Sequence, residues 1–376
     1  MTYRTLVVGG TGPSGPSVVE GVLERGHEVT ILHTGKHEVE FTQELEHIHA
    51  DPNQQASLTE ALAGRSFDLT IGLYGRLRLV AGAMRDCTER FIGVGGVFYP
   101  GWVDGNVVTK RTAGRPPAPD YTWTRPPVAE TTDLEVSGSF AEKAVESERL
   151  LMGWHGVGHF SATMLRYPRL YGPRQPAPIE WSILRRALDG RTRLLVPDGG
   201  LLLEHRLFSE NAARMVLAAV DHPQEAAGET FNCGDAEPMT MRDWATVLAA
   251  AADHTFDLVS VPFAIATPAF AYGRYPWCVC HRLLDTSKAR DLLDYRPIPA
   301  LVSLQRTAAW YLEHPLPRSG SEEEQLGDPF DYEREDALLA QLDALAATAA
   351  LEPPPTYSHP YDHPPEAETA TAVSAR

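Results

Sequence analysis

The first third of the chain alternates short apolar runs with helical stretches. Strands are predicted at Thr5–Val8, Val29–Leu32, Glu46–His49, Phe67–Leu73, Arg90–Val94 and Thr163–Arg166, with a late one at Glu229–Asn232. Helices are predicted between them at Val18–Arg25, Ser57–Leu62, Leu79–Cys87 and Phe140–Met152. This order of strand, helix and strand requires right-handed crossovers. It therefore predicts an α/β fold with a Rossmann-type, doubly wound parallel sheet.

The alternation weakens after Pro173, and prolines, arginines and helices dominate through Asp294. We therefore predict a Rossmann-type domain over residues 1–175, which the late strand near 229–234 rejoins. Residues 176–315 are predicted to form a smaller C-terminal substrate-binding lobe. Residues 316–376 turn acidic, carry one helical stretch and end in Pro-, His- and Ala-rich sequence, which predicts a partly disordered tail.

Composition narrows the class of protein. With 376 residues and 43% hydrophobic content, the chain can bury a large core. It has no long uncharged apolar stretch and no basic leader before the first strand, so we expect a soluble, cytoplasmic protein without a membrane partner. A formal net charge of -17 argues against nucleic acid as a partner.

The four cysteines are too few and too scattered for the disulfide framework of a secreted domain. Cys278-Val279-Cys280-His281 invites a metal interpretation, but no second pair of ligands stands at a zinc-site spacing. We therefore expect small buried thiols and no metal site.

A glycine-rich turn follows the first strand directly and opens the first helix. Glycines there let the backbone turn tightly and approach a pyrophosphate, whose charge the helix N-terminus stabilises. Because the pattern lies inside a strand–helix–strand unit, it predicts a dinucleotide site. The residues assigned to the pyrophosphate are Gly9, Thr11, Gly12, Pro13, Ser14 and Gly15.

The end of the second strand is expected to face the adenosine ribose. It reads His33-Thr34-Gly35-Lys36-His37, with no acidic residue to accept a hydrogen bond from a 2′-hydroxyl. Lys36 is suited to a 2′-phosphate, which favours NADP slightly over NAD. A solvent-exposed lysine in a turn is the alternative interpretation.

The glycine spacing and several later segments resemble the extended short-chain dehydrogenase/reductases, and within them the NAD-dependent epimerase/dehydratase group, close to its atypical members. The segments that carry the resemblance are His49-Ala50-Asp51, Phe67–Ile71, Leu165–Pro173, Phe231–Gly234 and Asp285–Ala289. They extend it from residue 1 to about residue 300.

This resemblance implies further cofactor residues. Asp51, after the third strand, would contact adenine, and Leu73 ends the fourth strand beside the cofactor. Tyr167, Pro168 and Leu170 belong to the strand and loop that lie along the nicotinamide. The resemblance also implies a homodimer through two helices of the Rossmann domain.

The family's chemistry needs a Tyr and a Lys four residues apart on one helix, with a Ser or Thr from the loop after strand five. Lys143 matches the lysine, which would hold the ribose. Ser139 stands where the tyrosine belongs, and the Gly95-Gly96 pair stands in place of the serines. Two of the three catalytic side chains are therefore absent from the matched positions.

Tyr99 and Tyr74 are candidates to carry out the proton transfer in place of the missing tyrosine. The alternative interpretation of each is a packed tyrosine whose hydroxyl is hydrogen-bonded. Ser139 either orients the substrate or caps its helix together with Glu142, and Lys143 has the alternative of a plain surface lysine.

In the second lobe, Arg206 stands where family members place an arginine that contacts the substrate, often through a phosphate. A salt bridge to Glu204 or Glu210 is its structural alternative.

Two functions remain open. The first is an NAD(P)-dependent oxidoreductase, epimerase or dehydratase with an atypical active site. It acts on a small hydroxyl- or carbonyl-bearing molecule through a different proton-transfer group. The second is a catalytically degenerate NAD(P)-binding protein that serves as a sensor or assembly partner. The preserved second lobe favours the enzyme, because a sensor would not need a substrate pocket.

Overall fold

The computed structural model describes residues 3–73, 75–100, 102, 126–134, 139–262, 265–269, 281–349 and 361. Residues up to Asp331 form one compact unit, and a second unit begins at Tyr332 with the helix α12 (Tyr332–Thr348). Of the residues singled out above, Tyr74, Cys278 and Cys280 lie outside the described residues.

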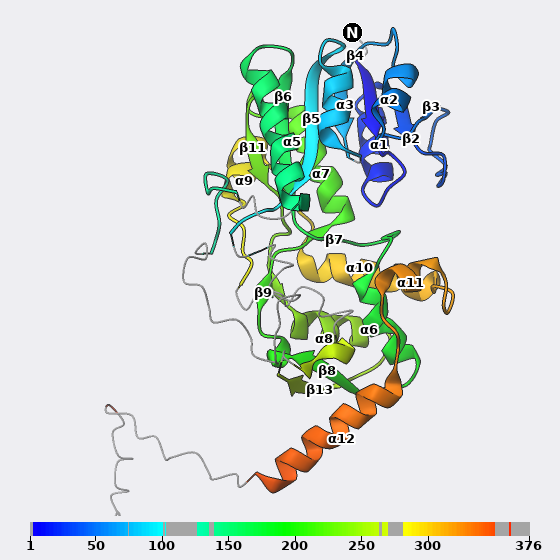
Figure 1. Cartoon of the computed structure of the whole chain (residues 1–376), viewed down its shortest axis with the longest axis vertical. Helices are drawn as coiled ribbons and strands as arrows, with labels where there is room; N and C mark the ends of the chain where they lie inside the picture. The colour runs from blue at the N-terminus through cyan, green and yellow to red at the C-terminus, as the bar shows by residue number, and fades with distance from the viewer. Residues whose placement is uncertain are drawn as a thin grey trace, which may run out of the picture. The chain divides into compact units, whose positions relative to one another are not determined.

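The described residues form a seven-stranded parallel sheet in the order β11-β6-β5-β4-β1-β2-β3 (Figure 1). The strands are β1 (Arg4–Val8), β2 (Glu28–His33), β3 (Glu46–His49), β4 (Phe67–Gly72), β5 (Thr88–Gly96), β6 (Ser161–Tyr167) and β11 (Thr230–Asn232). The predicted α/β fold class is confirmed, and each predicted strand forms at its predicted place.

Both faces of the sheet are covered by helices, so its strands read as nearly continuous apolar runs. Successive side chains of β1 enter opposite cores, Val7 on one face and Leu6 and Val8 on the other. The first core includes side chains of α1 (Gly15–Glu24), α7 (Ser209–Asp221) and α9 (Ser287–Leu293), and the second includes those of α2 (Gln55–Ala61), α3 (Leu77–Met84) and α5 (Ser139–Gly156).

The strand order reverses at β1, which pairs with β2 on one side and β4 on the other. Open α/β sheets bind ligands outside the carboxyl ends of the strands at such a switch point. The fold thus places the glycine turn after β1, and Leu73 after β4, at the expected crevice.

Beyond the carboxyl edge of the sheet lies a smaller lobe of helices and two-stranded pairs, seen below the sheet in Figure 1. Its strands pair as β10 with β7, β12 with β9 and β13 with β8. Its elements are β7 (Leu170–Tyr171), α6 (Ile179–Leu188), β8 (Arg193–Pro197), η1 (Asp198–Gly200), β9 (Leu203–Glu204), β10 (Leu207–Phe208), β12 (Met239–Thr240), α8 (Met241–Ala251), β13 (Asp257–Val261), η3 (Thr267–Ala269), α10 (Ala300–Glu313) and α11 (Ser321–Leu326).

Two buried ion pairs hold residues 321–328 against α6. Arg185 pairs with Glu323 at 2.5 Å, and Arg186 pairs with Asp328 at 2.6 Å. The side chains of Arg186 and Asp328 are both 0% exposed. The acidic segment that we predicted to begin a tail at residue 316 is therefore packed into the compact unit as far as Asp331, whereas the boundaries at 175 and 315 remain predictions.

Among the helices in the described ranges, none combines the length and the apolar composition that a membrane-crossing segment requires.

Candidate dinucleotide site

The three spaced positions of the first turn, Gly9, Gly12 and Gly15, are glycine for three different physical reasons. Gly9 has a φ of 91°, a conformation that side chains with a Cβ rarely adopt. A Cβ on Gly15 would lie 2.4 Å from the carbonyl of Gly10, so only glycine allows α1 to pack there. A Cβ on Gly12 would meet only the Gly9 carbonyl oxygen, at 3.6 Å, so no protein contact requires glycine there. The bare backbone of Gly12 instead leaves room for a ligand to approach.

The start of α1 presents its positive end to the same place. The N-cap Ser14 makes no side-chain capping hydrogen bond, so its hydroxyl does not occupy the first amides of the helix. Pro16, in the first turn, has no amide that would need a partner. The Gly15 amide already donates to the Gly12 carbonyl at 3.0 Å, so a pyrophosphate would meet the helix dipole and the remaining amides of the turn.

A cavity of about 750 Å³ opens beside the glycine turn. Thr11, Gly12 and Pro13 line one side of it. Its other lining residues are His37, Glu38, Val39, Glu40, Arg174, Gln175, Pro176, Trp310, Tyr311, Leu316, Ser321, Glu322 and Gln325. This volume suits a cofactor or drug-sized ligand.

Beyond β2, the predicted ribose-facing residues separate into buried and exposed ones. His33 is buried at 4% exposure, whereas Thr34 and Lys36 are exposed. The carboxylate of Asp51 accepts hydrogen bonds from the Asn53 amide at 2.9 Å and from the Gln54 side chain at 2.8 Å. These bonds lower the pKa of Asp51 and hold its carboxylate ionised in a local turn.

The predicted nicotinamide side lies at the ends of β4 and β6. The amide of Leu73 donates to the Val8 carbonyl at 2.9 Å, which aligns the ends of β4 and β1. Leu170 is half-buried and Pro168 buried. The Tyr167 ring lies in the core, and its hydroxyl donates to the Ala212 carbonyl at 2.8 Å, so Tyr167 supports this region from within the fold.

The predicted catalytic helix forms as α5. Ser139 begins it, although only its backbone is described, and Lys143 lies exposed one turn later.

Tyr99 is enclosed by a polar network. Its hydroxyl donates to Asn232 Oδ1 at 2.6 Å and accepts from Arg166 Nη1 at 2.9 Å, and the whole residue is 0% exposed. Arg166 also pairs with Glu148 of α5 at 2.5 Å. Burial raises the pKa of Tyr99. With its hydroxyl bonded on both sides and no exposure, Tyr99 fits the alternative prediction of a packed tyrosine with a bonded hydroxyl.

Comparison with known proteins agrees with this architecture. Residues 117–234 match the model of the NAD dependent epimerase/dehydratase family. The chain is 23% identical over 337 residues to a UDP-N-acetyl-alpha-D-glucosaminuronate decarboxylase of Bacillus cytotoxicus, covering 83% of this chain and 99% of that protein. It is 25% identical to a UDP-glucose 4-epimerase of Mycolicibacterium smegmatis, with coverage of 79% and 95%. The comparisons thus agree with the resemblance to the NAD-dependent epimerase/dehydratase group that the sequence indicated.

Solved structures of epimerases share the fold of this chain. The UDP-glucose 4-epimerase of Thermotoga maritima superposes with a TM-score of 0.65 at 17% identity, covering 83% of this chain and 99% of that one. The UDP-glucuronic acid 4-epimerase of Bacillus cereus in complex with NAD gives a TM-score of 0.62 at 17% identity, covering 83% and 100%.

The glycine pair that ends β5 is packed closely. A Cβ on Gly95 would lie 2.2 Å from Met164 Cε, and one on Gly96 would lie 2.9 Å from the Phe98 ring. Restoring a serine at either position would therefore require neighbouring side chains to move.

Arg206 lies in a buried cluster of charges in the second lobe. It pairs with Glu204 at 3.1 Å, and its guanidinium lies 3.8 Å from the centre of the Trp244 ring. Although burial opposes ionisation, the charges of Arg282 and Arg206 hold the pKa of Glu204 below its usual value. The structural alternative predicted for Arg206 is therefore present. Its buried Nη1 has no hydrogen-bond partner, so the residue keeps donor capacity for a ligand.

Sequence reasoning missed several polar groups that define this region. His205 is buried and neutral, because burial lowers its pKa to about 4, and its Nδ1 accepts from the Leu284 amide at 2.8 Å. Asp235 accepts from Tyr171, Asn211 and the Phe208 amide, and burial raises its pKa to about 6. Only the fold brings these partners together, and no local spacing signals them.

Proposed function

We propose that the protein is an NAD(P)-dependent enzyme of the epimerase/dehydratase type that acts on a hydroxyl- or carbonyl-bearing substrate. The observation that carries this proposal is the glycine turn at the switch point, where Gly12 leaves open space in front of the N-terminus of α1. Backbone conformation and packing explain why positions 9 and 15 are glycine, but neither explains Gly12. A bound ligand would explain why position 12 lacks a side chain.

When bound, a nicotinamide cofactor supplies a hydride acceptor or donor at its C4. Lys143, one turn into α5, would hold the ribose. A substrate hydroxyl that is oxidised must pass its proton to a group of this chain. Because Tyr99 is buried and fully bonded, Tyr74 is the remaining candidate from the sequence for that group.

Nucleotide sugars are the substrate class that we propose to test first. The curated relatives named above are a decarboxylase and an epimerase of UDP-sugars, and the chain spans almost their whole length. In support, Arg206 keeps a buried donor in the second lobe, where a diphosphate group would pair with it.

The choice between NAD and NADP rests on the end of β2, which has no acidic residue and carries the exposed Lys36. We propose that Lys36 favours a 2′-phosphate. Titration with NADH and NADPH, followed by nicotinamide fluorescence, tests this: Lys36→Ala should weaken NADPH binding and leave NADH binding unchanged. Absence of binding for both cofactors would overturn the proposed function.

A second candidate is a dinucleotide-binding protein without catalysis. The observation that favours it is the close packing at Gly95 and Gly96, which leaves no hydroxyl at the end of β5. Assay of the cofactor-loaded protein with a panel of UDP-sugars separates the two. Interconversion, dehydration or decarboxylation of any of them supports the enzyme, whereas firm cofactor binding without turnover supports the alternative.

A further inference from the structure

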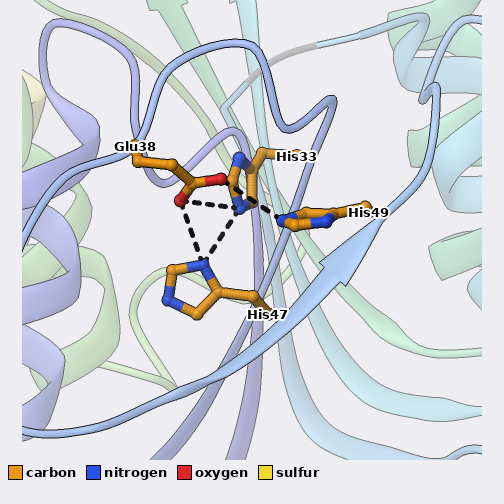
Figure 2. A group of neighbouring side chains, drawn as sticks. All are labelled: His33, Glu38, His47 and His49. Atoms are coloured by element: carbon orange, nitrogen blue, oxygen red, sulfur yellow. Dashed lines mark hydrogen bonds and ion pairs between the residues drawn. The ribbon is translucent and has the colours of Figure 1, made fainter.

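Three histidines and one glutamate converge at the carboxyl end of β2 and β3. His33 is the last residue of β2, His47 and His49 belong to β3, and Glu38 comes from the loop between the two strands. Figure 2 shows the three imidazoles around the Glu38 carboxylate, with one nitrogen of each directed toward it. One ligand atom from each residue lies within 4.8 Å of all the others.

The register of the two strands explains this convergence. In the parallel pair, His33 lies opposite His49, and Ile31 lies opposite His47. Paired residues share a face of the sheet, and residues two apart on one strand share it as well. The sequence His47-Ile48-His49 therefore presents both imidazoles on the face that His33 occupies, while Ile48 enters the opposite core.

The distances match the edges of a small coordination polyhedron. His33 Nε2 lies 3.1 Å from His47 Nδ1. Glu38 Oε2 lies 3.8 Å from His33 Nε2 and 3.4 Å from His47 Nδ1, and Glu38 Oε1 lies 3.3 Å from His49 Nε2. A tetrahedral zinc ion with ligands at about 2.1 Å has ligand–ligand edges of about 3.4 Å. These contacts lie near that edge length, and one ligand atom from each residue lies within 4.8 Å of the others, so the side chains would close slightly around an ion.

Without a cation, the protons of this cluster do not satisfy all of its contacts. The Gly35 amide donates to His33 Nδ1 at 3.3 Å, so a neutral His33 carries its proton on Nε2 and donates it to His47 Nδ1. The Glu38 carboxylate then faces the lone-pair side of His47 Nδ1 at 3.4 Å. A cation in front of the Glu38 carboxylate and His47 Nδ1 would offset the repulsion between their lone pairs.

The cluster is also accessible to an ion. Binding of a metal at His33 Nε2 would require the ring proton to be on Nδ1, in place of the long hydrogen bond from the Gly35 amide. The side chains of Glu38 and His49 are more than half exposed, so an ion can enter from solvent.

We propose that His33, Glu38, His47 and His49 form a binding site for a divalent transition-metal ion, with Zn²⁺ as its preferred occupant. Three imidazoles and one carboxylate suit Zn²⁺, whereas Mg²⁺ and Ca²⁺ take oxygen ligands. Because Glu38 also lines the cavity beside the glycine turn, a bound ion would fix one wall of that cavity.

The test uses tag-free full-length protein, stripped with a chelator and titrated with ZnCl₂ by calorimetry. We expect one Zn²⁺ per chain, and Co²⁺ in its place should give the intense visible bands of a tetrahedral site. Substituting both His47→Gln and His49→Gln should weaken binding at least ~100-fold, since even outer-shell changes at metal sites cost 10–100-fold.

Two matched variants serve as controls. His37→Gln removes an exposed histidine of the same loop that is not among the four ligands, and Cys278→Ser with Cys280→Ser removes the other ligand-rich segment of the sequence. Both should keep one Zn²⁺ per chain. Failure of the wild-type protein to bind Zn²⁺, or equal binding by the His47/His49 variant, would overturn the site. Neither readout depends on cofactor binding or turnover.

Discussion

The guanidinium of Arg166 donates to the hydroxyl of Tyr99 at 2.9 Å, and both side chains are buried where β5 and β6 end. Arg166 also donates to the Glu130 carbonyl at 3.1 Å, while Tyr99 donates onward to Asn232 of β11. The network thus ties the ends of three neighbouring strands to the segment around Glu130. Tyr99, which the sequence offered as a candidate for proton transfer, therefore stabilises the packing of these strand ends.

Replacing Tyr99 by Phe should accordingly lower stability and leave the chemistry intact. The substitution removes one partner each from Asn232 and Arg166 in a buried setting, which costs about 1–3 kcal/mol. Urea unfolding measures this loss, and turnover in the absence of denaturant measures the chemistry. A large loss of turnover with unchanged stability would instead assign Tyr99 to catalysis.

Replacing Glu148 by Ala should be more damaging. It removes the carboxylate that pairs with Arg166 at 2.5 Å, where the two side chains are 9% and 6% exposed. Breaking one side of a buried ion pair costs about 3–5 kcal/mol, because the remaining charge stays buried. Glu146→Ala, an exposed change on the same helix, is the matched control and should unfold at the wild-type urea concentration.

The glycine turn yields a pair of substitutions with opposite expectations. Gly12→Ala places its Cβ in open space, so the protein should fold normally, within about 0.5 kcal/mol of wild type, but lose dinucleotide affinity. Gly15→Ala forces a Cβ against the Gly10 backbone and should destabilise the fold itself. Thermal unfolding and NADH titration of both variants check this. Tight NADH binding by Gly12→Ala would contradict the proposed position of the pyrophosphate.

His205 should make stability depend on pH. Its folded pKa of about 4 lies below the unfolded value of 6.5, so the unfolded chain takes up a proton first as pH falls. The stability that His205 contributes is complete above pH 6.5 and is lost between pH 6.5 and 4, by about 3 kcal/mol.

His205→Asn keeps an acceptor for the Leu284 amide and removes the titration. Urea unfolding across this pH range should show the wild type losing stability relative to the variant as pH falls. Parallel curves for the two proteins would show that His205 is not buried in the neutral form.

The acidic segment after residue 315 provides a truncation test. A chain ending at Asp331 keeps Glu323 and Asp328 and should fold as the compact unit does. A chain ending at residue 315 removes the buried carboxylates that pair with Arg185 and Arg186, and it should be insoluble or unfold cooperatively at much lower temperature. Circular dichroism melting of both truncations measures the difference.

The sequence by itself determined the parallel sheet and the site of the glycine turn, because both rest on local patterns. Apolar runs of strand length mark strands that are buried on both faces, and a glycine turn between strand and helix restricts the backbone whatever the rest of the chain does. For this reason every strand of the sheet, and the position of Lys143 on α5, could be predicted.

Tertiary structure alone decided the roles of the polar residues. Only the folded structure shows that Arg206 pairs with Glu204 and that Tyr99 is enclosed. It also shows that Asp328 belongs to the core, because its partner Arg186 lies 142 residues away in the chain. The His33, His47 and His49 cluster depends in the same way on the register of two strands. A polar side chain takes its role from its burial and its partners, and no local pattern of residues encodes either.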